Sequence, residues 1–237
     1  MKNIKNDWWK TDFDNNFYKI YYHYLKQNYS VYIDRLIKFT NLKKEKAVLD
    51  LACGSGEHLI ALHKKGFNNV EGSDYNYAET AQKNTKKYKI LIQKKDMREK
   101  LGKNVYDLIT LNSTSFGYFN DNDNKKVLKN CYEALKSKGS LFINNLSREF
   151  IVDNFHPKSW TKLGPNVFLL EERWWSKNKK SLLSSWHLVE KNRVHTLSNK
   201  LRLYSAQEFK NLFYEIGFKK IKIKKINAHN WFLAIKK

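Results

Sequence analysis

A short acidic and glycine-rich segment carries the clearest chemical signal in this sequence. The segment Asp50-Leu-Ala-Cys-Gly54-Ser-Gly56 ends an apolar run, and Asp74 follows Gly54 by 20 residues. Glycines at such a turn let the backbone approach a ligand where a Cβ would clash. A carboxylate at the position of Asp74 would accept hydrogen bonds from both hydroxyls of a ribose. The pattern predicts a nucleotide-type ligand, and the alternative is a structural turn with an acidic residue nearby by chance.

The residues around this turn exclude two common nucleotide motifs. Leu59 stands where the dinucleotide fingerprint has its third glycine, and Glu57-His58 stand where a P-loop has Lys and Ser or Thr. An acidic Glu57 at a helix start would oppose a pyrophosphate, and Asp50 adds further negative charge. Negative groups suit a cationic ligand, and S-adenosylmethionine, with its sulfonium and α-ammonium, is the obvious candidate.

The elements that must position these residues alternate between strands and helices. The apolar patterns predict strands at 47–52, 69–73, 89–93, 106–111 and 140–145, and helices at 57–65, 77–87 and 122–137. This alternation predicts an α/β fold with a parallel, doubly wound sheet. Apolar residues at helical spacing over 14–40, among them Phe17, predict one or two amphipathic helices before the sheet.

The alternation breaks after Asn145 and resumes near the end of the chain. Short β-prone runs between turn residues over 150–203 predict an antiparallel insertion. Ser205-Ala-Gln-Glu208 then has the form of a capping box, and Gly217 is expected to end the helix that it starts. Two closing strands are expected near 219–226 and 230–235.

Several motifs together resemble one enzyme family. Val48-Leu-Asp-Leu-Ala-Cys-Gly-Ser-Gly-Glu-His58 resembles motif I of class I S-adenosylmethionine-dependent methyltransferases. The likeness continues through Lys95-Asp-Met-Arg98, Ser113-Thr-Ser-Phe-Gly-Tyr-Phe119 and Leu201-Arg-Leu-Tyr204, and it covers nearly the whole chain. These three elements resemble a bacterial subgroup of small-molecule and peptide N- or O-methyltransferases. The sequence departs from the family at Ser73, usually apolar, and at Ser137-Lys138, where a proline and a glycine are usual.

The resemblance implies the fold and the organisation of the chain. It implies a Rossmann-like, doubly wound, seven-stranded methyltransferase sheet with an antiparallel β insertion after the fifth strand. The expected core comprises residues 41–149 and 204–237, with 150–203 as a substrate-side insertion and 1–40 as an amino-terminal helical lid.

The resemblance also implies S-adenosylmethionine as cofactor, and a set of site residues. Asp74 would hold the ribose, Asp96 would accept from the exocyclic amine of the adenine, and Asn112 would lie beside the reacting sulfonium. The residues expected at the cofactor are Asp50, Ala52, Gly54, Gly56, His58, Asp74, Tyr75, Asp96, Met97 and Asn112. The residues expected at the substrate are Ser115, Tyr118, Phe119, Arg148, Arg202 and Tyr204. No catalytic base and no metal site is assigned.

The positive charge of the chain raises a second hypothesis. The sequence has 45 Lys and Arg against 23 Asp and Glu, a formal charge of +22, which would suit an RNA or DNA methyltransferase. Only six of the basic residues are arginine, however, and arginine is the residue that makes bidentate hydrogen bonds to guanine and phosphate. Asn112-Ser-Thr-Ser115 also replaces the [DNS]-P-P-[YFW] loop typical of base-amine methylation. The favoured acceptor is therefore a small metabolite, a sugar intermediate or a peptide amine, with a non-catalytic S-adenosylmethionine-binding protein as a further alternative.

Composition suggests where such a protein works. Two cysteines among 237 residues form no disulfide framework or zinc motif, so a reducing compartment is expected. No window approaches the roughly 20 apolar residues of a membrane span, so we expect a cytoplasmic protein without a membrane partner. A monomer or a homodimer is expected.

Overall fold

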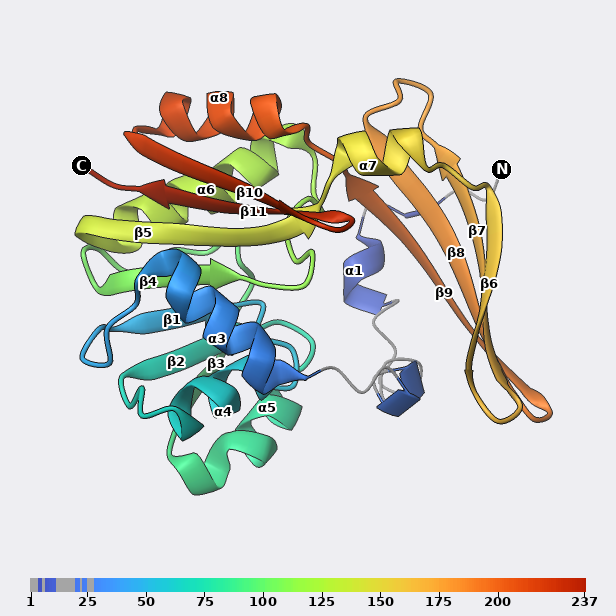
Figure 1. Cartoon of the computed structure of the whole chain (residues 1–237), viewed down its shortest axis with the longest axis horizontal. Helices are drawn as coiled ribbons and strands as arrows, with labels where there is room; N and C mark the ends of the chain where they lie inside the picture. Colours follow the sequence, from blue (N-terminus) through green and yellow to red (C-terminus); the bar gives the residue numbers. More distant parts are fainter. Residues whose placement is uncertain (1–3, 6, 12–19, 22, 25–27) are drawn as a thin grey trace. The chain divides into compact units, whose positions relative to one another are not determined.

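The computed structural model describes residues 4, 5, 7–11, 20, 21, 23, 24 and 28–237 (Figure 1). The chain divides into two compact units. The sheet unit comprises residues 28–150 and 204–237, and the insertion unit comprises residues 151–203 together with the described residues before Asn28. The amino-terminal boundary thus falls at residue 28, whereas the sequence suggested residue 40, because helix α3 (Tyr29–Thr40) packs on helix α4 (Glu57–Lys64) of the sheet unit. Helix α3 confirms part of the amphipathic helical pattern predicted over 14–40, and Phe17 lies outside the described residues.

The sheet unit is built on a seven-stranded sheet in the order β10-β11-β5-β4-β1-β2-β3. Strand β11 runs antiparallel to both of its neighbours, and the remaining pairs are parallel. The strands are β1 (Val48–Leu51), β2 (Val70–Asp74), β3 (Leu91–Lys94), β4 (Tyr106–Leu111), β5 (Leu135–Leu146), β10 (Lys220–Ile226) and β11 (His229–Ile235). This architecture confirms the predicted doubly wound α/β fold.

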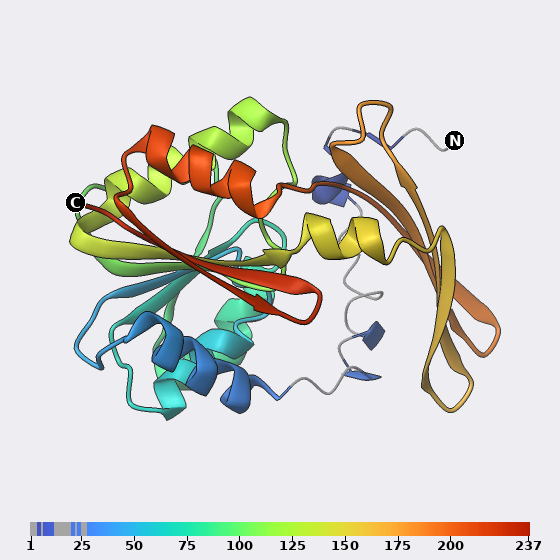
Figure 2. The ribbon, with the colours of Figure 1, turned by 45° about the horizontal axis from the view of Figure 1, so that its top comes forward.

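Helices cover both faces of this sheet (Figure 2). They are α3 (Tyr29–Thr40), α4 (Glu57–Lys64), α5 (Ala78–Thr85) with the 3-10 turn η1 (Lys86–Tyr88), α6 (Asp121–Ala134) and α8 (Ala206–Ile216). The first three lie on one face, where Leu36 and Leu59 join Trp231 in one buried cluster. On the other face Phe209 of α8 stacks on Phe232 of β11, with ring centroids 4.3 Å apart. Burial of these apolar faces is the main force that holds the layers together.

The junction between α6 and β5 differs from the prediction. The sequence suggested a helix to residue 137 and a strand from 140, but the helix ends at Ala134 and the strand begins at Leu135. Leu135 pairs with Tyr106, and the register then shifts so that Ser140 pairs with Leu108. The extra residues form an irregularity in which Lys138 has a φ of 61°. Sequence periodicity carries no signal for such a bulge.

The carboxyl-terminal helix α8 follows its sequence signals closely. Ser205 accepts from the backbone N–H of Glu208, and the Glu208 side chain accepts from the backbone N–H of Ser205, which confirms the capping box. Gly217, with a φ of 122°, ends the helix as predicted. The helix leads into the β10–β11 hairpin at the edge of the sheet.

The insertion unit is a four-stranded antiparallel sheet in the order β6-β7-β8-β9 (Figure 1). Its strands are β6 (Lys158–Gly164), β7 (Val167–Trp175), β8 (Ser181–Glu190) and β9 (Arg193–Arg202), and its short helix is α1 (Trp8–Thr11). Helix α7 (Arg148–Asp153) begins in the sheet unit and ends in this one. Leu169 and Leu188 form part of its small core, against which Tyr21 and Trp186 pack. The predicted antiparallel insertion is confirmed.

Two global features complete the description of the fold. Cys53 and Cys131 are both buried free thiols. Among the helices of the described residues, none is long and apolar enough to cross a membrane.

Candidate functional site

The turn between β1 and α4 leaves open space beside its backbone. Ala52, Gly54 and Gly56 have positive φ angles of 59°, 56° and 91°. A Cβ added at Gly54 would meet no atom of the described residues within 4 Å, whereas one at Gly56 would lie 2.9 Å from Cγ2 of Thr85. Gly56 therefore serves the packing of the turn, and Gly54 leaves room for a ligand to approach the chain. Ala52 holds a strained left-handed conformation, a feature that concentrates at functional sites.

Asp74, the last residue of β2, clamps this turn. Its Oδ2 accepts from the backbone N–H of Gly54 at 2.9 Å, and its Oδ1 accepts from those of Asn76 and Tyr77 at 2.9 and 2.8 Å. Burial raises the pKa of Asp74, and the three backbone donors oppose that rise. Each carboxylate oxygen has two acceptor positions, so Oδ2 keeps one beyond its bond to Gly54.

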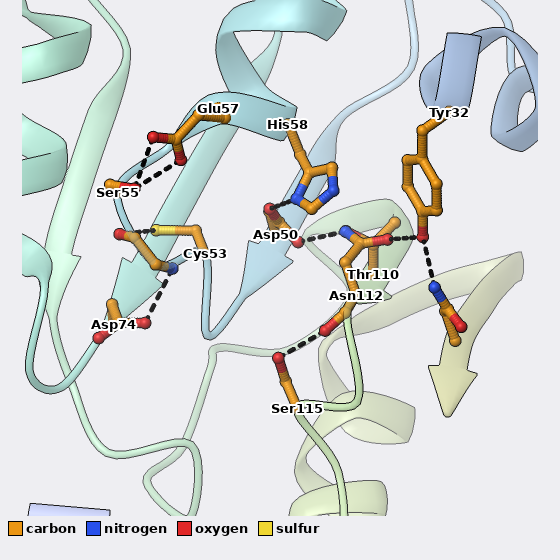
Figure 3. A network of polar contacts seen from close by, with 12 residues as sticks. Tyr32, Asp50, Cys53, Ser55, Glu57, His58, Asp74, Thr110, Asn112 and Ser115 are labelled. Atoms are coloured by element: carbon orange, nitrogen blue, oxygen red, sulfur yellow. Dashed lines mark hydrogen bonds and ion pairs between the residues drawn. The ribbon is translucent and has the colours of Figure 1, made fainter. Parts of the chain in front are cut away.

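Asp50, near the end of β1, has an incomplete set of hydrogen bonds (Figure 3). Its Oδ1 accepts from Oγ1 of Thr110 and Nδ2 of Asn112, both at 2.7 Å. Its Oδ2 is buried and has no hydrogen-bond partner among the described residues. Proteins rarely leave a buried polar atom unpaired. This oxygen is therefore a position where a cationic or hydrogen-bonding ligand would relieve an unfavourable burial.

Among the described residues, no cationic side chain neutralises the Asp50 carboxylate. Burial raises the pKa of Asp50 to about 7, and the negative charges of Asp74 and Glu57 add to that rise. Nδ1 of His58 lies 3.9 Å from Oδ2 of Asp50, but burial lowers the pKa of His58 to about 4. At neutral pH the imidazole is therefore uncharged and does not neutralise Asp50. A bound cation would favour the ionised carboxylate.

The loop after β4 is strained where it passes the site. Ser113 and Thr114 both have left-handed φ angles, of 52° and 63°. Oγ of Ser115 donates to the backbone oxygen of Asn112 at 2.6 Å, and the N–H of Thr114 donates to the backbone oxygen of Asn144 at 2.9 Å. These bonds fix Asn112 at the level of Asp50, directly after the fourth strand. Its contact with a cofactor stays a prediction.

Asp96, after β3, is engaged by a residue that the sequence argument did not assign. Nη2 of Arg98 donates to Oδ2 of Asp96 at 2.7 Å, and Nε reaches Oδ1 at 3.1 Å. Nη1 of Arg98 also donates to Oδ2 of Asp123 at 3.1 Å, and the guanidinium lies over the ring of Phe119, 4.5 Å from its centroid. Arg98 therefore fixes the Asp96 carboxylate in place, and the neighbouring Met97 is only half-buried.

Comparison with known proteins decides the family. The family described as a methyltransferase domain matches residues 21–223, most of the chain. The chain belongs to this methyltransferase family. Membership confirms the class predicted from the sequence, an S-adenosylmethionine-dependent methyltransferase.

Individual relatives of the methyltransferase are distant. A Bacillus subtilis protein with the name "Putative methyltransferase YqeM" is 24% identical over 187 residues, 75% of each chain. An S-adenosylmethionine-dependent methyltransferase from Clostridium acetobutylicum superposes with a TM-score of 0.74 at 20% identity, covering 94% of this chain and 98% of its own. CalS10, an amino pentose methyltransferase from Micromonospora echinaspora, gives 0.74 at 15% identity, with coverages of 93% and 96%. At such identities the structures establish a shared fold alone.

Two predicted tyrosines of the methyltransferase lie in loops near Asp74. Tyr75 directly follows Asp74 and is 37% exposed. Burial raises the pKa of Tyr118, and the negative charge of Asp74 adds to the rise, so the phenol remains protonated. The structure thus brings Tyr118 within electrostatic reach of the turn, in the loop that also carries Ser115.

Two other predicted substrate residues are committed to packing. Oη of Tyr204 donates to Oδ1 of Asp121 at 2.9 Å and accepts from Nδ2 of Asn124 at 3.1 Å. Nδ2 of Asn124 also donates to the backbone oxygen of Phe119 at 2.8 Å, and Phe119 and Tyr204 are both buried. Both residues therefore stabilise the start of α6, and their contact with substrate stays a prediction.

The two predicted arginines lie in different units. Arg148 is the first residue of α7 and belongs to the sheet unit. Arg202 ends β9 in the insertion unit, is buried, and donates through Nη1 to the backbone oxygen of Leu203. Their meeting at one substrate site stays a prediction.

Sequence reasoning missed several residues of the network around Asp50. Thr110 pairs with Asp50 in the β1–β4 register, and it is a polar residue within the apolar run 108–111, which is a signal the sequence does contain. Tyr32 and Asn144 also belong to the network, and neither stands in a pattern that marks it.

Proposed function

We propose that this methyltransferase binds S-adenosylmethionine at the carboxyl ends of β1 and β2 and methylates a small metabolite, a sugar intermediate or a peptide amine. The observation that carries the proposal is the unpaired Oδ2 of Asp50. A buried anionic oxygen is costly unless a cation or donor meets it, and the cofactor carries an ammonium and a sulfonium charge. The open space beside Gly54 gives such a ligand access to the turn.

The proposed cofactor residues cluster at the ends of neighbouring strands. Asp50 and Gly54 would hold the methionine end, and Asp74 would accept from the ribose with its remaining acceptor position. Asp96 and Met97 would flank the adenine, as the family resemblance implies. The other proposed contacts are Ala52, Gly56, His58, Tyr75 and Asn112.

The protein's part in the chemistry is largely positional. The cofactor, when bound, supplies a methyl group that a nucleophile takes by in-line displacement. The chain must hold that nucleophile in line and keep water out. A neutral amine reacts without a base, whereas a hydroxyl or ammonium group needs one, and we assign no residue to that role.

The acceptor is proposed from the loop residues and from the relatives. Ser115, Tyr118, Arg148 and Arg202 are the polar residues that we propose contact it, and Phe119 and Tyr204 would support them. CalS10, which shares the fold, acts on an amino pentose, and this supports an acceptor that carries an amine. The proposal includes methyl transfer to nitrogen and methyl transfer to oxygen.

The setting of the enzyme is also part of the proposal. The buried free thiols of Cys53 and Cys131 fit a reducing, cytoplasmic compartment. We expect a monomer or a homodimer, and light scattering after gel filtration measures the molar mass that distinguishes them.

Two experiments test the proposed function. Calorimetry should show that the purified chain binds S-adenosylmethionine and its demethylated product, and the proposal fails if it binds neither. Labelled S-adenosylmethionine is then offered with amino sugars, peptides, metabolite extract, tRNA and DNA. Label should enter small molecules or peptides; label in nucleic acid alone would instead support a function for the +22 charge. Binding without transfer to any acceptor would support a non-catalytic protein.

A further inference from the structure

The hydrogen bonds around Asp50 continue into helix α3. Oη of Tyr32 donates to Oδ1 of Asn112 at 2.7 Å and accepts from Nδ2 of Asn144 at 3.2 Å (Figure 3). The same Asn112 donates through Nδ2 to Oδ1 of Asp50 at 2.7 Å. Tyr32 thus connects a helix that precedes the sheet to the carboxylate proposed to receive the cofactor.

Strand register places the members of this network at one level. Asp50 pairs with Thr110 across β1 and β4, and Thr110 pairs with Phe142 across β4 and β5. Asn112 and Asn144 each follow two residues later on their chain segments, so their side chains project from the same face of the sheet. Tyr32 reaches both of them from α3, on the face that this helix covers.

The bonds run in one direction through the network. The Asn144 amide donates to the Tyr32 hydroxyl, so the hydroxyl proton is left to point at Oδ1 of Asn112. With its oxygen held in this way, the Asn112 amide must present its nitrogen to Asp50. An amide rotated by half a turn would place its oxygen against the carboxylate and repel it.

Packing holds the Tyr32 ring while its hydroxyl acts. The ring centroid lies 4.9 Å from that of His58 and 5.5 Å from that of Trp231. Burial raises the pKa of Tyr32, and the charge of Asp50 adds to the rise, so the phenol keeps its proton and remains a donor. Removing the hydroxyl oxygen alone therefore separates the packing role of the ring from the hydrogen-bonding role of the hydroxyl.

We propose that Tyr32 is a positioning residue of the cofactor site, which fixes the Asn112 amide so that its N–H faces the Asp50 carboxylate and holds it in place. The inference rests on the proposed function, in which Asp50 receives the cationic end of S-adenosylmethionine. Tyr32 acts through Asn112 and takes no direct part in methyl transfer.

The variant Tyr32→Phe tests this role against the matched control Tyr29→Phe. Tyr29 lies one turn earlier on α3 and also contacts His58, edge-on and with ring centroids 5.3 Å apart, but its hydroxyl has no hydrogen bond among the described residues. Both variants keep their rings, so both should fold. Thermal unfolding of each variant checks this.

The first readout is the titration of Asp50 in the free protein, followed through its carboxyl carbon by NMR. The bond from Asn112 lowers the pKa of Asp50, so its loosening in Tyr32→Phe should raise that pKa above the wild-type value of about 7. His58, Glu57 and Asp74 also face Asp50, and the substitution leaves all three unchanged. Tyr29→Phe should titrate as the wild type does.

The second readout is the affinity for S-adenosylmethionine as a function of pH. Because the cation binds the ionised carboxylate, Tyr32→Phe should bind about three- to tenfold more weakly at pH 7 and recover most of this loss at higher pH. A purely structural defect would weaken binding equally at every pH.

The outcomes separate the inference from the proposed function. Unchanged Asp50 titration and an unchanged pH profile in Tyr32→Phe would overturn the role of Tyr32, as would equal shifts in Tyr29→Phe. If the wild type binds no S-adenosylmethionine, the proposed function fails, and the Asp50 titration, which needs no ligand, still decides the role of Tyr32. If Tyr32→Phe does not fold, Asn144→Ala replaces it, because it removes the amide that donates to the Tyr32 hydroxyl. Asn144→Ala should also raise the pKa of Asp50, by a smaller amount than is expected for Tyr32→Phe.

Discussion

The carboxyl ends of β1 and β2 carry two acidic side chains in very different surroundings. Asp74 accepts three backbone N–H groups, spread over both of its oxygens. Asp50 receives two side-chain donors on one oxygen and none on the other among the described residues. A carboxylate whose two oxygens both accept from backbone groups stabilises the turn itself. One that is buried and half-bonded is expected to meet its full complement of partners only when a ligand is bound.

The largest expected effect comes from Asp50→Asn. Loss of the buried charge should weaken S-adenosylmethionine binding by roughly a hundredfold or more, because the cation loses its partner. The free protein should be as stable as the wild type or more so, since a neutral amide avoids the burial of a charge. Equilibrium dialysis and urea unfolding measure the two quantities. Wild-type affinity in this variant would remove Asp50 from the site.

Asp74→Asn should reduce stability more, and cofactor affinity less, than Asp50→Asn does. An amide cannot accept from all three backbone N–H groups, so at least one is left unpaired, and the free energy of unfolding should fall by about 1–3 kcal/mol. Affinity should fall by roughly tenfold, because the turn loosens and an acceptor for the ribose is lost. The same dialysis and urea measurements apply. If stability were unchanged, the contrast between the two acids would be lost.

The ionisation of Asp50 should give stability and binding opposite pH dependences. Its pKa is about 7 in the folded protein and 3.8 when exposed, so the unfolded chain ionises first. The contribution of Asp50 to the free energy of unfolding therefore falls as pH rises from about 4 to about 7 and is constant above that. Affinity for the cofactor should rise over the upper part of this interval. Other groups titrate in the same interval, among them His58, whose pKa burial lowers to about 4. Asp50→Asn is therefore the control: the difference between the wild type and this variant should show both dependences, and the interpretation fails if the two proteins have the same pH profiles.

The smallest effect is expected at the glycine turn. Gly54→Ala should lower the free energy of unfolding by about 1–2 kcal/mol, because the position has a positive φ, and it should weaken cofactor binding severalfold as the methyl group enters the open space. Gly66→Ala, with a φ of 88° at a distant turn, is the matched control. It should lose stability similarly and keep its affinity. Equal affinities in the two variants would mean that no ligand approaches Gly54.

Much of the sheet unit could be predicted because its strands and helices are local patterns. The apolar runs of β1 and β4, the capping box at Ser205 and the stop at Gly217 each act over a few residues, and each is where it was expected. The start of β5 was not where it was expected. It depends on a shift in the β4–β5 register between Tyr106 and Leu108, and such a shift arises from pairing between segments that are distant in sequence.

The site could be predicted only where a motif marked it. Asp50, Gly54 and Asp74 stand at spacings that reflect strand ends and turns, so the sequence identifies them. Tyr32 contacts Asn112 across 80 positions of sequence, and no local pattern encodes such a contact. The sequence could name the acids, therefore, but it could not say which of them is left half-bonded.

The most direct test of the central claim compares two ligands in two proteins. S-adenosylmethionine carries the cationic groups, whereas 5′-methylthioadenosine keeps the nucleoside and lacks both charges. Calorimetry should find that Asp50→Asn loses roughly a hundredfold in affinity for the first and stays within about twofold of the wild type for the second. An equal loss for both ligands, or no loss for S-adenosylmethionine, would contradict the assignment of Asp50 as the partner of the cation.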